Sequence, residues 1–259
     1  MIEKIAIIVP IYKPDIDIVT EYSITTLFNV LSTKNRDVFF VSSRDMSKEN
    51  YINLANKLTE NYVYWIDENP EYFKSKETYS KMLMSYDFWK RFEAYEYVLI
   101  YQTDCLLLKD NLDTWASFGY DYIGAPILGT GSDWKHIPCV GNGGLSLRKV
   151  STFLYMTNPN GEFIEEFKDE ISEACKANNV YLDYEDLYFS DLIPSLWCGF
   201  KKPNYKIAAK FAFDRNPDIA LQITNALPDG IHWFDKYTKY YKSLGVDIPD
   251  KIIEYTDEN

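Results

Sequence analysis

A short apolar run that ends abruptly in polar residues constrains this chain more than any other feature. Residues 97–101 (Tyr-Val-Leu-Ile-Tyr) lead directly into a Gln-Thr-Asp triplet at residues 102–104. A lone carboxylate just past the end of a buried strand is where an open α/β sheet places its chemistry. A second run, residues 5–9, is continuously apolar and stops at Pro10, which fits a strand buried on both faces of a parallel sheet.

Strand and helix patterns alternate along the first half of the chain. Further strands are predicted at residues 37–41 and 62–66, and helices at 15–31 and 77–92. Another helix is predicted to begin with Ser47 as its N-cap, and Asn50 occupies the third position after this cap. This alternation predicts crossover units and one α/β domain, residues 1–259, with a mostly parallel, Rossmann-like sheet.

The second half has a more helical pattern. We expect helices at 150–156, 162–177, 187–193 and 234–244. A strand is expected at 207–213, a turn and short strand at 229–233, and a frayed acidic end. These segments form helical and small-strand additions at the C-terminal side of the domain.

Composition excludes several classes of protein. The 259 residues are 46% hydrophobic, which is enough for a sizeable core, and the net charge of -12 argues against nucleic-acid binding. The four cysteines form no Cys-x-x-Cys pair, which disfavours zinc and predicts buried thiols of a reducing cell. The first apolar run is too short for a signal peptide, and no run reaches the roughly 20 residues of a membrane span. A cytoplasmic protein is expected, and the lysines and tyrosines of residues 236–242 leave peripheral membrane contact open.

The order of four segments resembles the glycosyltransferases of the GT-A class. Residues 9–12 (Val-Pro-Ile-Tyr) are similar to the nucleotide-binding opening of that class, and residues 102–104 to its DxD element. Residues 184–186 (Tyr-Glu-Asp) are similar to its xED element, and His232 lies where such enzymes often carry a metal-binding histidine.

Three segments resemble, more narrowly, an uncharacterised domain family grouped with glycosyltransferases. They are residues 101–104, 120–126 (Tyr-Asp-Tyr-Ile-Gly-Ala-Pro) and 140–148 (Val-Gly-Asn-Gly-Gly-Leu-Ser-Leu-Arg), of which the last is the most specific. The resemblance covers residues 77–235 well. It implies a nucleotide-binding half, residues 1–126, and an acceptor-side half, residues 127–259.

The resemblance implies a divalent metal, Mn²⁺ or Mg²⁺, held by Asp104 and His232, because charge develops on the departing diphosphate. The chain departs from the family pattern at Gln102, which replaces the first acid of DxD and brings no charge. Asp104 could instead cap a turn, and His232 could be a satisfied buried histidine.

The acidic pair Glu185 and Asp186 is the predicted catalytic centre, with Asp186 as the base that deprotonates the acceptor hydroxyl. A base on the face opposite the leaving group inverts the anomeric centre, although the sequence leaves retention open. Carboxylates at the start of a helix also act simply as caps and dipole partners.

The remaining predicted contacts belong to the donor and acceptor. Those to the nucleotide are Pro10, Tyr12, Asp45, Gln102, Thr103 and Asp104, and those to the sugars are Lys81, Asn142, Gly143 and Gly144. Tyr79 is a further candidate beside the diphosphate. Glycines permit close backbone approach to a ligand, although they also mark strand bulges. The loop 129–136, with Trp134 and His136, is a candidate lid.

These observations predict a glycosyltransferase that moves a sugar from a nucleotide-diphosphate donor, a UDP-sugar, to a hydroxyl of a glycan, glycolipid or glycoprotein, as in polysaccharide biosynthesis. Two alternatives remain. One is an inactive sugar- or nucleotide-binding scaffold, which Gln102 supports. The other is a nucleotidyltransferase, which the absence of glycine from residues 9–12 disfavours.

Overall fold

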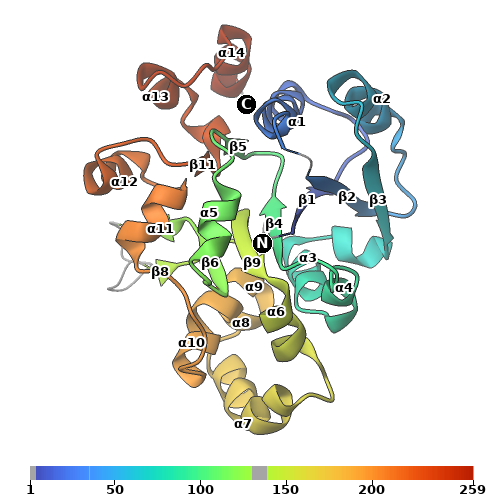
Figure 1. The fold of residues 1–259 in the computed structure, drawn as a ribbon, viewed down its shortest axis with the longest axis vertical. Coiled ribbons are helices and arrows are strands. Elements are labelled where there is room, and N and C mark those ends of the chain that lie inside the picture. Colours follow the sequence, from blue (N-terminus) through green and yellow to red (C-terminus); the bar gives the residue numbers. More distant parts are fainter. Residues whose placement is uncertain (1–3, 35, 130–138, 259) are drawn as a thin grey trace.

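A six-stranded sheet lies at the centre of the computed structural model, which describes residues 4–34, 36–129 and 139–258 (Figure 1). Its strands run in the order β3 (Val63–Glu68), β2 (Asp37–Ser43), β1 (Ile5–Ile11), β4 (Tyr97–Tyr101), β9 (Leu145–Lys149) and β6 (Tyr122–Gly124). Pairing from β3 through β4 is parallel, and β9 is antiparallel to both of its neighbours. The predicted α/β fold with a mostly parallel sheet is confirmed.

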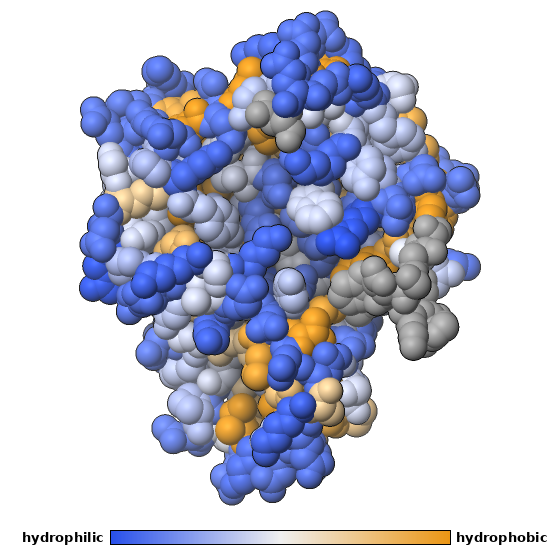
Figure 2. Space-filling model, turned by 180° about the vertical axis from the view of Figure 1, so that it is seen from behind, coloured by the Kyte–Doolittle hydropathy of each residue, from blue (hydrophilic) through white to orange (hydrophobic). Residues whose placement is uncertain are grey.

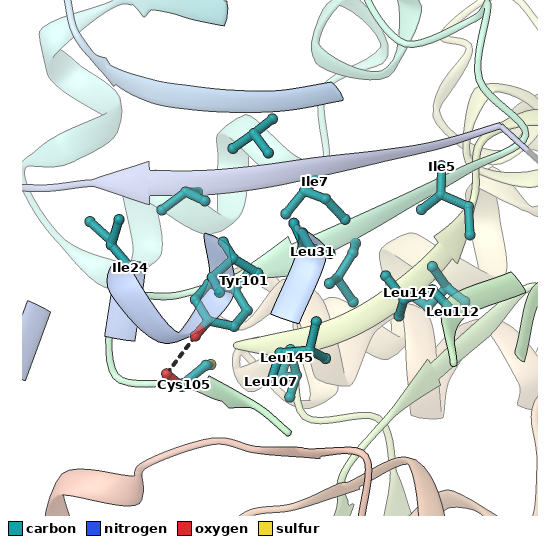
Figure 3. Close-up of a cluster of buried hydrophobic side chains, with 14 of the residues drawn as sticks. Ile5, Ile7, Ile24, Leu31, Tyr101, Cys105, Leu107, Leu112, Leu145 and Leu147 are labelled. Atoms are coloured by element: carbon teal, nitrogen blue, oxygen red, sulfur yellow. Dashed lines mark hydrogen bonds between the residues drawn. The ribbon is translucent and has the colours of Figure 1, made fainter. Parts of the chain in front are cut away.

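Strand β1 sends its side chains alternately to the two faces of the sheet. Ile5, Ile7 and Val9 enter one hydrophobic cluster, whereas Ala6 and Ile8 enter another. Figure 3 shows part of the first cluster, where the hydroxyl of Tyr101 donates a 2.8 Å hydrogen bond to the carbonyl of Cys105. Burial on both faces explains why the strand is a continuous apolar run.

Helices cover both faces of this sheet. The first cluster includes residues of α1 (Ile18–Leu31), α2 (Glu49–Leu58), α5 (Leu112–Ser117) and α11 (Tyr205–Phe211). The second includes residues of α3 (Lys76–Leu83), α4 (Tyr86–Lys90), α6 (Val150–Thr157), α7 (Glu162–Ala177), the π-helical turn η2 (Tyr188–Leu192) and α10 (Ile193–Leu196). Turn η1 (Pro70–Phe73) and helix α8 (Val180–Asp183) pack against the second cluster, and α9 (Glu185–Leu187) follows α8.

A third cluster organises the C-terminal region. It surrounds a small sheet of β10 (Ala212–Phe213), β11 (Gly230–Ile231) and β5 (Leu106–Leu107). Around it lie α12 (Pro217–Thr224), turn η3 (Phe234–Lys236), α13 (Thr238–Ser243) and α14 (Asp250–Glu258). Strands β7 (Pro126–Ile127) and β8 (Cys139–Val140) form a separate pair. On the face seen in Figure 2, hydrophilic side chains dominate and apolar ones form only small patches.

Two predicted boundaries in the first half are wrong. Strand β1 continues through Pro10, because beyond Ile8 only β2 pairs with it and proline is tolerated where one strand edge is unpaired. The predicted cap at Ser47 does not form. Helix α2 begins at Glu49 after Lys48, and the amide of Asn50 donates instead to the carbonyl of Pro14 at 3.1 Å.

The predicted helix 77–92 is two helices, α3 and α4. The helix is interrupted at Met84 and Ser85. The indole N–H of Trp89 donates a 2.7 Å hydrogen bond to the carbonyl of Leu83. This bond satisfies a carbonyl that the break leaves without a helical partner. The fully buried Trp89 therefore stabilises the break in the helix.

Three predictions in the second half are wrong. Most of the strand expected at 207–213 is helix α11, which the side chain of Asn204 caps by accepting from two backbone N–H groups. The helix expected at 234–244 is divided into η3 and α13. The end expected to fray forms α14, because Ile252 is buried in the third cluster.

Candidate active site

A cavity of about 460 Å³ opens where β1 and β4 end. Seventeen residues from separate parts of the chain line it: Tyr12, Phe73, Ser75, Lys76, Tyr79, Ser80, Gln102, Asp104, Asn142, Gly143, Gly144, Tyr184, Glu185, Asp186, Arg215, His232 and Trp233. In open α/β sheets, ligands bind beyond the carboxyl ends of the strands. The structure thus brings together most of the residues that the sequence predicts for the site.

Asp104 and His232 face each other in this cavity. The Nε2 atom of His232 lies 3.5 Å from Oδ1 of Asp104, while its Nδ1 lies 3.0 Å from Oδ1 of Asp214. The imidazole is only 4% exposed, and within the described residues its Nε2 makes no hydrogen bond. A histidine that binds a metal typically has one ring nitrogen hydrogen-bonded to a carboxylate and the other free for the metal. His232 has this arrangement, with Asp214 at Nδ1 and Asp104 beside Nε2.

The charges of this pair also favour a cation. Although burial alone would lower the pKa of His232, the carboxylates of Asp104 and Asp214 raise it. Burial raises the pKa of Asp104, and the imidazole opposes that shift. Positive charge at Nε2 is therefore stabilised from two sides, and the two predicted ligands fit a divalent metal.

Strand register explains how Asp214 and His232 meet. Strands β10 and β11 are parallel, with Phe213 opposite Ile231, so the next residues of both strands emerge side by side. The N–H of His232 also donates a 2.8 Å hydrogen bond to the carbonyl of Phe213. Asp214 is 2% exposed and accepts a further bond, 3.2 Å long, from the amide of Asn142.

Cys105 joins the same group, because its sulfur lies within 4.8 Å of the ligand atoms of Asp104 and His232. Its thiol donates to the carbonyl of Gly144 at 3.3 Å, and burial raises its pKa well above the ordinary value. Mn²⁺ and Mg²⁺ prefer oxygen and imidazole ligands to sulfur, and this thiol already has a partner in Gly144, so we favour two protein ligands rather than three. Cys105 and Cys175 are buried as predicted, whereas Cys198 is exposed, contrary to the prediction.

Gly144 forms the floor beneath His232. A Cβ atom there would lie 2.2 Å from Nε2 of the imidazole, and the side chain of Asn142 holds this backbone by accepting from the N–H of Gly144 at 2.9 Å. Its neighbour Gly143 has no room either, since a Cβ would lie 2.8 Å from Oε1 of Glu185. We predicted that Gly143 and Gly144 allow a ligand to approach the backbone closely. In the structure they leave room for the side chains of Glu185 and His232.

We expect the substitution Gly144→Ala to displace the imidazole of His232. Mn²⁺ binding should weaken about tenfold or more, as when the support of a ligand is removed. Titration of Mn²⁺ followed by electron paramagnetic resonance measures this directly. The same substitution at Gly161, which precedes α7 outside the cavity, should leave Mn²⁺ affinity unchanged. Equal Mn²⁺ affinity in the Gly144→Ala variant and the wild type would contradict the assignment.

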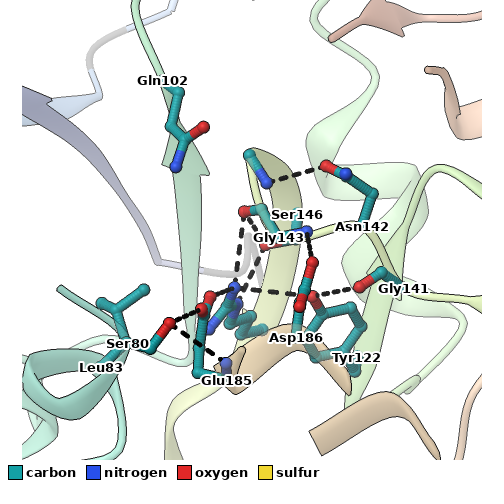
Figure 4. A network of polar contacts seen from close by, with 12 residues as sticks. Ser80, Leu83, Gln102, Tyr122, Gly141, Asn142, Gly143, Ser146, Glu185 and Asp186 are labelled. Atoms are coloured by element: carbon teal, nitrogen blue, oxygen red, sulfur yellow. Dashed lines mark hydrogen bonds and ion pairs between the residues drawn. The ribbon is translucent and has the colours of Figure 1, made fainter. Parts of the chain in front are cut away.

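A buried ion pair fixes the acidic pair at the opposite wall (Figure 4). Arg148, fully buried on β9, donates to Oε1 of Glu185 at 2.8 Å, and its ring-facing guanidinium lies 4.9 Å from the centroid of Tyr122. The hydroxyl of Ser80 donates to the other oxygen of Glu185 at 3.0 Å. Glu185 therefore links β9, α3 and α9, and both of its oxygens are engaged.

Asp186 is the less constrained acid of the pair. Its Oδ2 accepts from the N–H of Gly143 at 3.2 Å, and its Oδ1 from the N–H of Leu187 at 2.8 Å. Burial, followed by the negative charge of Glu185, raises the pKa of Asp186 to about 7. A carboxylate with this pKa that lines a cavity can accept a proton near neutral pH.

The nucleotide side contains part of the predicted set. Tyr12 is 44% exposed and lies 5.5 Å from Tyr79, ring centroid to centroid, and the amide of Gln102 donates to the Tyr12 hydroxyl at 3.5 Å. Thr103 lines an adjoining hollow that shares Tyr12, Gln102 and Asp104 with the main cavity. An exposed aromatic face beside these polar groups is suited to stack on a base or sugar.

Besides Thr103, three predicted contacts do not line the main cavity. Pro10 is buried within β1, whereas Asp45 and Lys81 are exposed on the loop after β2 and on α3. Lys81 points away because the cavity face of α3 carries Tyr79 and Ser80 instead. The proposed lid residues Trp134 and His136 lie outside the described residues.

Sequence reasoning missed four functional candidates: Arg148, Asp214, Arg215 and Trp233. Asp214 and Arg215 follow the segment expected as a strand, where no acidic motif draws attention. The one signal in the sequence is that His232 and Trp233 directly follow a predicted short strand. That signal does not reveal Asp214 and Arg215, because β10 pairs with β11 only through a tertiary contact.

The predicted basic-aromatic surface at residues 236–242 is largely neutralised. Lys236 pairs with Asp235, Lys239 with Asp257 and Lys242 with Asp250, and Tyr241 is fully buried. Little free positive charge remains there to attract an anionic surface. No helix in the described ranges is both long and apolar enough to cross a bilayer.

Comparison with solved structures defines the class of fold. The galactosyltransferase LgtC, in complex with donor and acceptor sugar analogues, matches with a TM-score of 0.58 and 14% identity, over 88% of this chain and 86% of LgtC. The glycosyltransferase GlyE of Streptococcus pneumoniae TIGR4 matches with a TM-score of 0.50 and 15% identity, over 89% of this chain and 54% of GlyE. The fold is that of the GT-A glycosyltransferases.

Sequence comparison identifies the family. The family model described as "Protein of unknown function (DUF5672)" matches residues 64–232, and the chain belongs to this family. No curated protein matches the chain. The matched residues include every cavity-lining residue except Tyr12 and Trp233.

Proposed function

We propose that this protein is a metal-assisted glycosyltransferase that uses a nucleoside diphosphate sugar, with a UDP-sugar as the expected donor and a glycan, glycolipid or glycoprotein hydroxyl as acceptor. The observation that carries the proposal is the open Nε2 of His232 opposite Asp104, in the same cavity as Asp186. A metal site and a basic carboxylate in one cavity are the two parts that glycosyl transfer from a diphosphate requires.

The chemistry follows from these positions. The acceptor oxygen forms a bond to the anomeric carbon, its proton passes to the carboxylate of Asp186, and the bond between that carbon and the diphosphate oxygen breaks with its electron pair leaving on the diphosphate. Asp104 and His232 would hold Mn²⁺ or Mg²⁺, which supplies positive charge to the departing diphosphate. Asp186 acts as a base on the acceptor, which corresponds to inversion of the anomeric centre.

The remaining contacts support the two substrates. Tyr12 would stack on the nucleotide, while Gln102 and Thr103 would contact its ribose. Asn142 would bind a sugar hydroxyl, although its amide also donates to Asp214. The division into a nucleotide-binding half, residues 1–126, and an acceptor-side half, residues 127–259, remains part of this proposal.

Thermal unfolding with a panel of nucleoside diphosphates, with and without Mn²⁺, tests the donor site. A ligand that binds only the native state at a hundred times its Kd should raise the melting temperature by about 5–10 °C. We expect such a shift for at least one nucleotide, only with Mn²⁺, and its loss in the Asp104→Ala variant. The exposed Asp169 of α7 offers a control, since Asp169→Ala should keep the shift.

An inactive binding scaffold is the second candidate, because Gln102 removes one negative charge from the predicted metal site. A scaffold would show the same thermal shift without turnover. Release of nucleoside diphosphate from the sugar nucleotide, measured without an acceptor, separates the two. If no nucleotide shifts the wild type, the donor site itself is wrongly assigned.

A further inference from the structure

The guanidinium of an arginine lies over the ring of a tryptophan in the wall of the candidate active site. The guanidinium carbon of Arg215 lies 4.5 Å from the ring centroid of Trp233, and both residues line the cavity that contains Asp104 and His232. They follow Asp214 and His232 directly, so the β10–β11 register that joins the first pair also brings the second pair together. The stack is thus fixed one residue beyond the metal ligand.

The backbone of Trp233 is unusual in a way that serves this arrangement. Consecutive residues of an extended chain point to opposite faces, so Trp233 would be expected to turn away from the cavity that His232 enters. Its φ of 57° lies in the left-handed region, which is uncommon for a bulky residue. Trp233 still lines the cavity, with its ring centroid 5.7 Å from that of His232. Such strain is concentrated at functional sites.

The charge of Arg215 is available to a ligand. Its side chain is exposed, and among the described residues it makes no hydrogen bond and no ion pair. By contrast, Arg148 is consumed by its pair with Glu185. In a protein of net charge -12, a guanidinium that lines a cavity with Asp104, Asp186 and Glu185, and that has no ion pair within the part of the chain that the structure describes, is not a generic surface charge.

We propose that Arg215, held by Trp233, binds an oxyanion of the substrate. This inference rests on the proposed function and names a group that recognises its substrates. The first source is the diphosphate of the donor, which carries two negative charges in the sugar nucleotide and a third once the sugar leaves. Asp104 adds a negative charge beside it, so one divalent cation does not balance the site. The second source of the same chemistry is a carboxylate or phosphate on the acceptor.

The geometry suits an oxyanion better than a neutral ligand. The contact of the guanidinium with the ring uses none of its N–H groups in a hydrogen bond, and these groups match two oxygens of a phosphate or carboxylate at once. The stack also holds the side chain, so less freedom is lost when the anion binds. A lysine at this position would provide the charge without the planar fork.

Binding of UDP and of uridine in the presence of Mn²⁺, measured by calorimetry, tests the first source. In the Arg215→Met variant, UDP should bind about tenfold more weakly, whereas uridine should bind as it does to the wild type. Arg215→Lys should recover only part of the affinity. Lys210→Met removes an equal charge on the exposed face of α11, outside the cavity, and should change neither affinity.

A second pair of probes, methyl glucuronide and methyl glucoside added to the UDP complex, tests the acceptor. Unchanged UDP affinity with selective loss of glucuronide binding in Arg215→Met assigns the arginine to an acidic acceptor. Unchanged binding of both UDP and glucuronide overturns the inference. If the wild type itself binds no UDP, GDP or other nucleoside diphosphate, the proposed function fails instead, and this inference fails with it.

Discussion

Replacing Asp186 with asparagine should lower the rate of sugar transfer about a thousandfold, because the amide cannot take the proton of the acceptor. Asparagine keeps the shape of the side chain, although its single amide oxygen can accept from only one of the N–H groups of Gly143 and Leu187. Donor affinity should stay within about twofold of the wild type, because neither bond involves the donor. Steady-state turnover and calorimetric UDP binding measure the two effects separately. The Asp183→Asn variant, three residues earlier and outside the cavity, is the matched control and should transfer normally.

The pH dependence carries the same assignment. Because the base must be ionised, wild-type turnover should rise with pH and level off above about 7, the raised pKa of Asp186. A carboxyl group whose pKa is higher in the folded state than in the unfolded state binds more protons in the folded state. The free energy of unfolding therefore decreases as the pH rises from the ordinary pKa of the group to about 7. Asp186→Asn should therefore be more stable than the wild type at pH 8, by about 1–2 kcal/mol after solvent screening, and nearly equal at pH 4. A less stable variant at pH 8, or a flat rate profile, would contradict the role of Asp186.

Replacing Arg148 with methionine should destabilise the protein by about 3–5 kcal/mol. The substitution leaves the buried carboxylate of Glu185 without its 2.8 Å partner and removes the contact between the guanidinium and Tyr122. Urea unfolding measures the change in the free energy of unfolding. The double variant Arg148→Met, Glu185→Gln removes both charges and should recover much of the loss.

The exposed Arg44 provides the control for this prediction. Arg44→Met removes a charge whose Nε only approaches the carbonyl of Glu68 at 3.4 Å, so the expected change is within about 0.5 kcal/mol. Equal costs at Arg44 and Arg148 would mean that the buried ion pair does not anchor the acidic wall. The cost at Arg148 should also appear as lost transfer activity, since Glu185 positions the neighbouring Asp186.

The sequence predicted the site best where a residue follows a strongly patterned strand. The runs that became β1 and β4 are buried on both faces, so their pattern alone placed Asp104 at the carboxyl edge of the sheet. His232 and Asp186 were placed by resemblance, and the structure brings both into the same cavity as Asp104. Their chemical roles stay predictions until activity is measured.

The parts that sequence reasoning missed depend on tertiary contacts. Residues 207–213 are apolar enough for either a strand or a helix, and the cap at Asn204 and the helix-favouring Ala208 and Ala209 decide for α11. Only the last two residues pair as β10, which then aligns Asp214 with His232. The interruption between α3 and α4 likewise depends on a side-chain contact, the hydrogen bond that the indole N–H of Trp89 donates to the carbonyl of Leu83.

The glycine floor of the cavity limits how this protein can diversify. Any side chain at Gly143 or Gly144 would collide with Glu185 or His232. A substitution at either glycine would therefore displace one of these two side chains and disrupt the site. We expect variation to be tolerated instead around the mouth, where Lys76 and Tyr184 are exposed and have no contact with the donor in the proposed function. Relatives that accept different sugars should therefore differ at Lys76 and Tyr184 and keep Gly143 and Gly144, and a library built to change substrate choice should start from those two exposed positions.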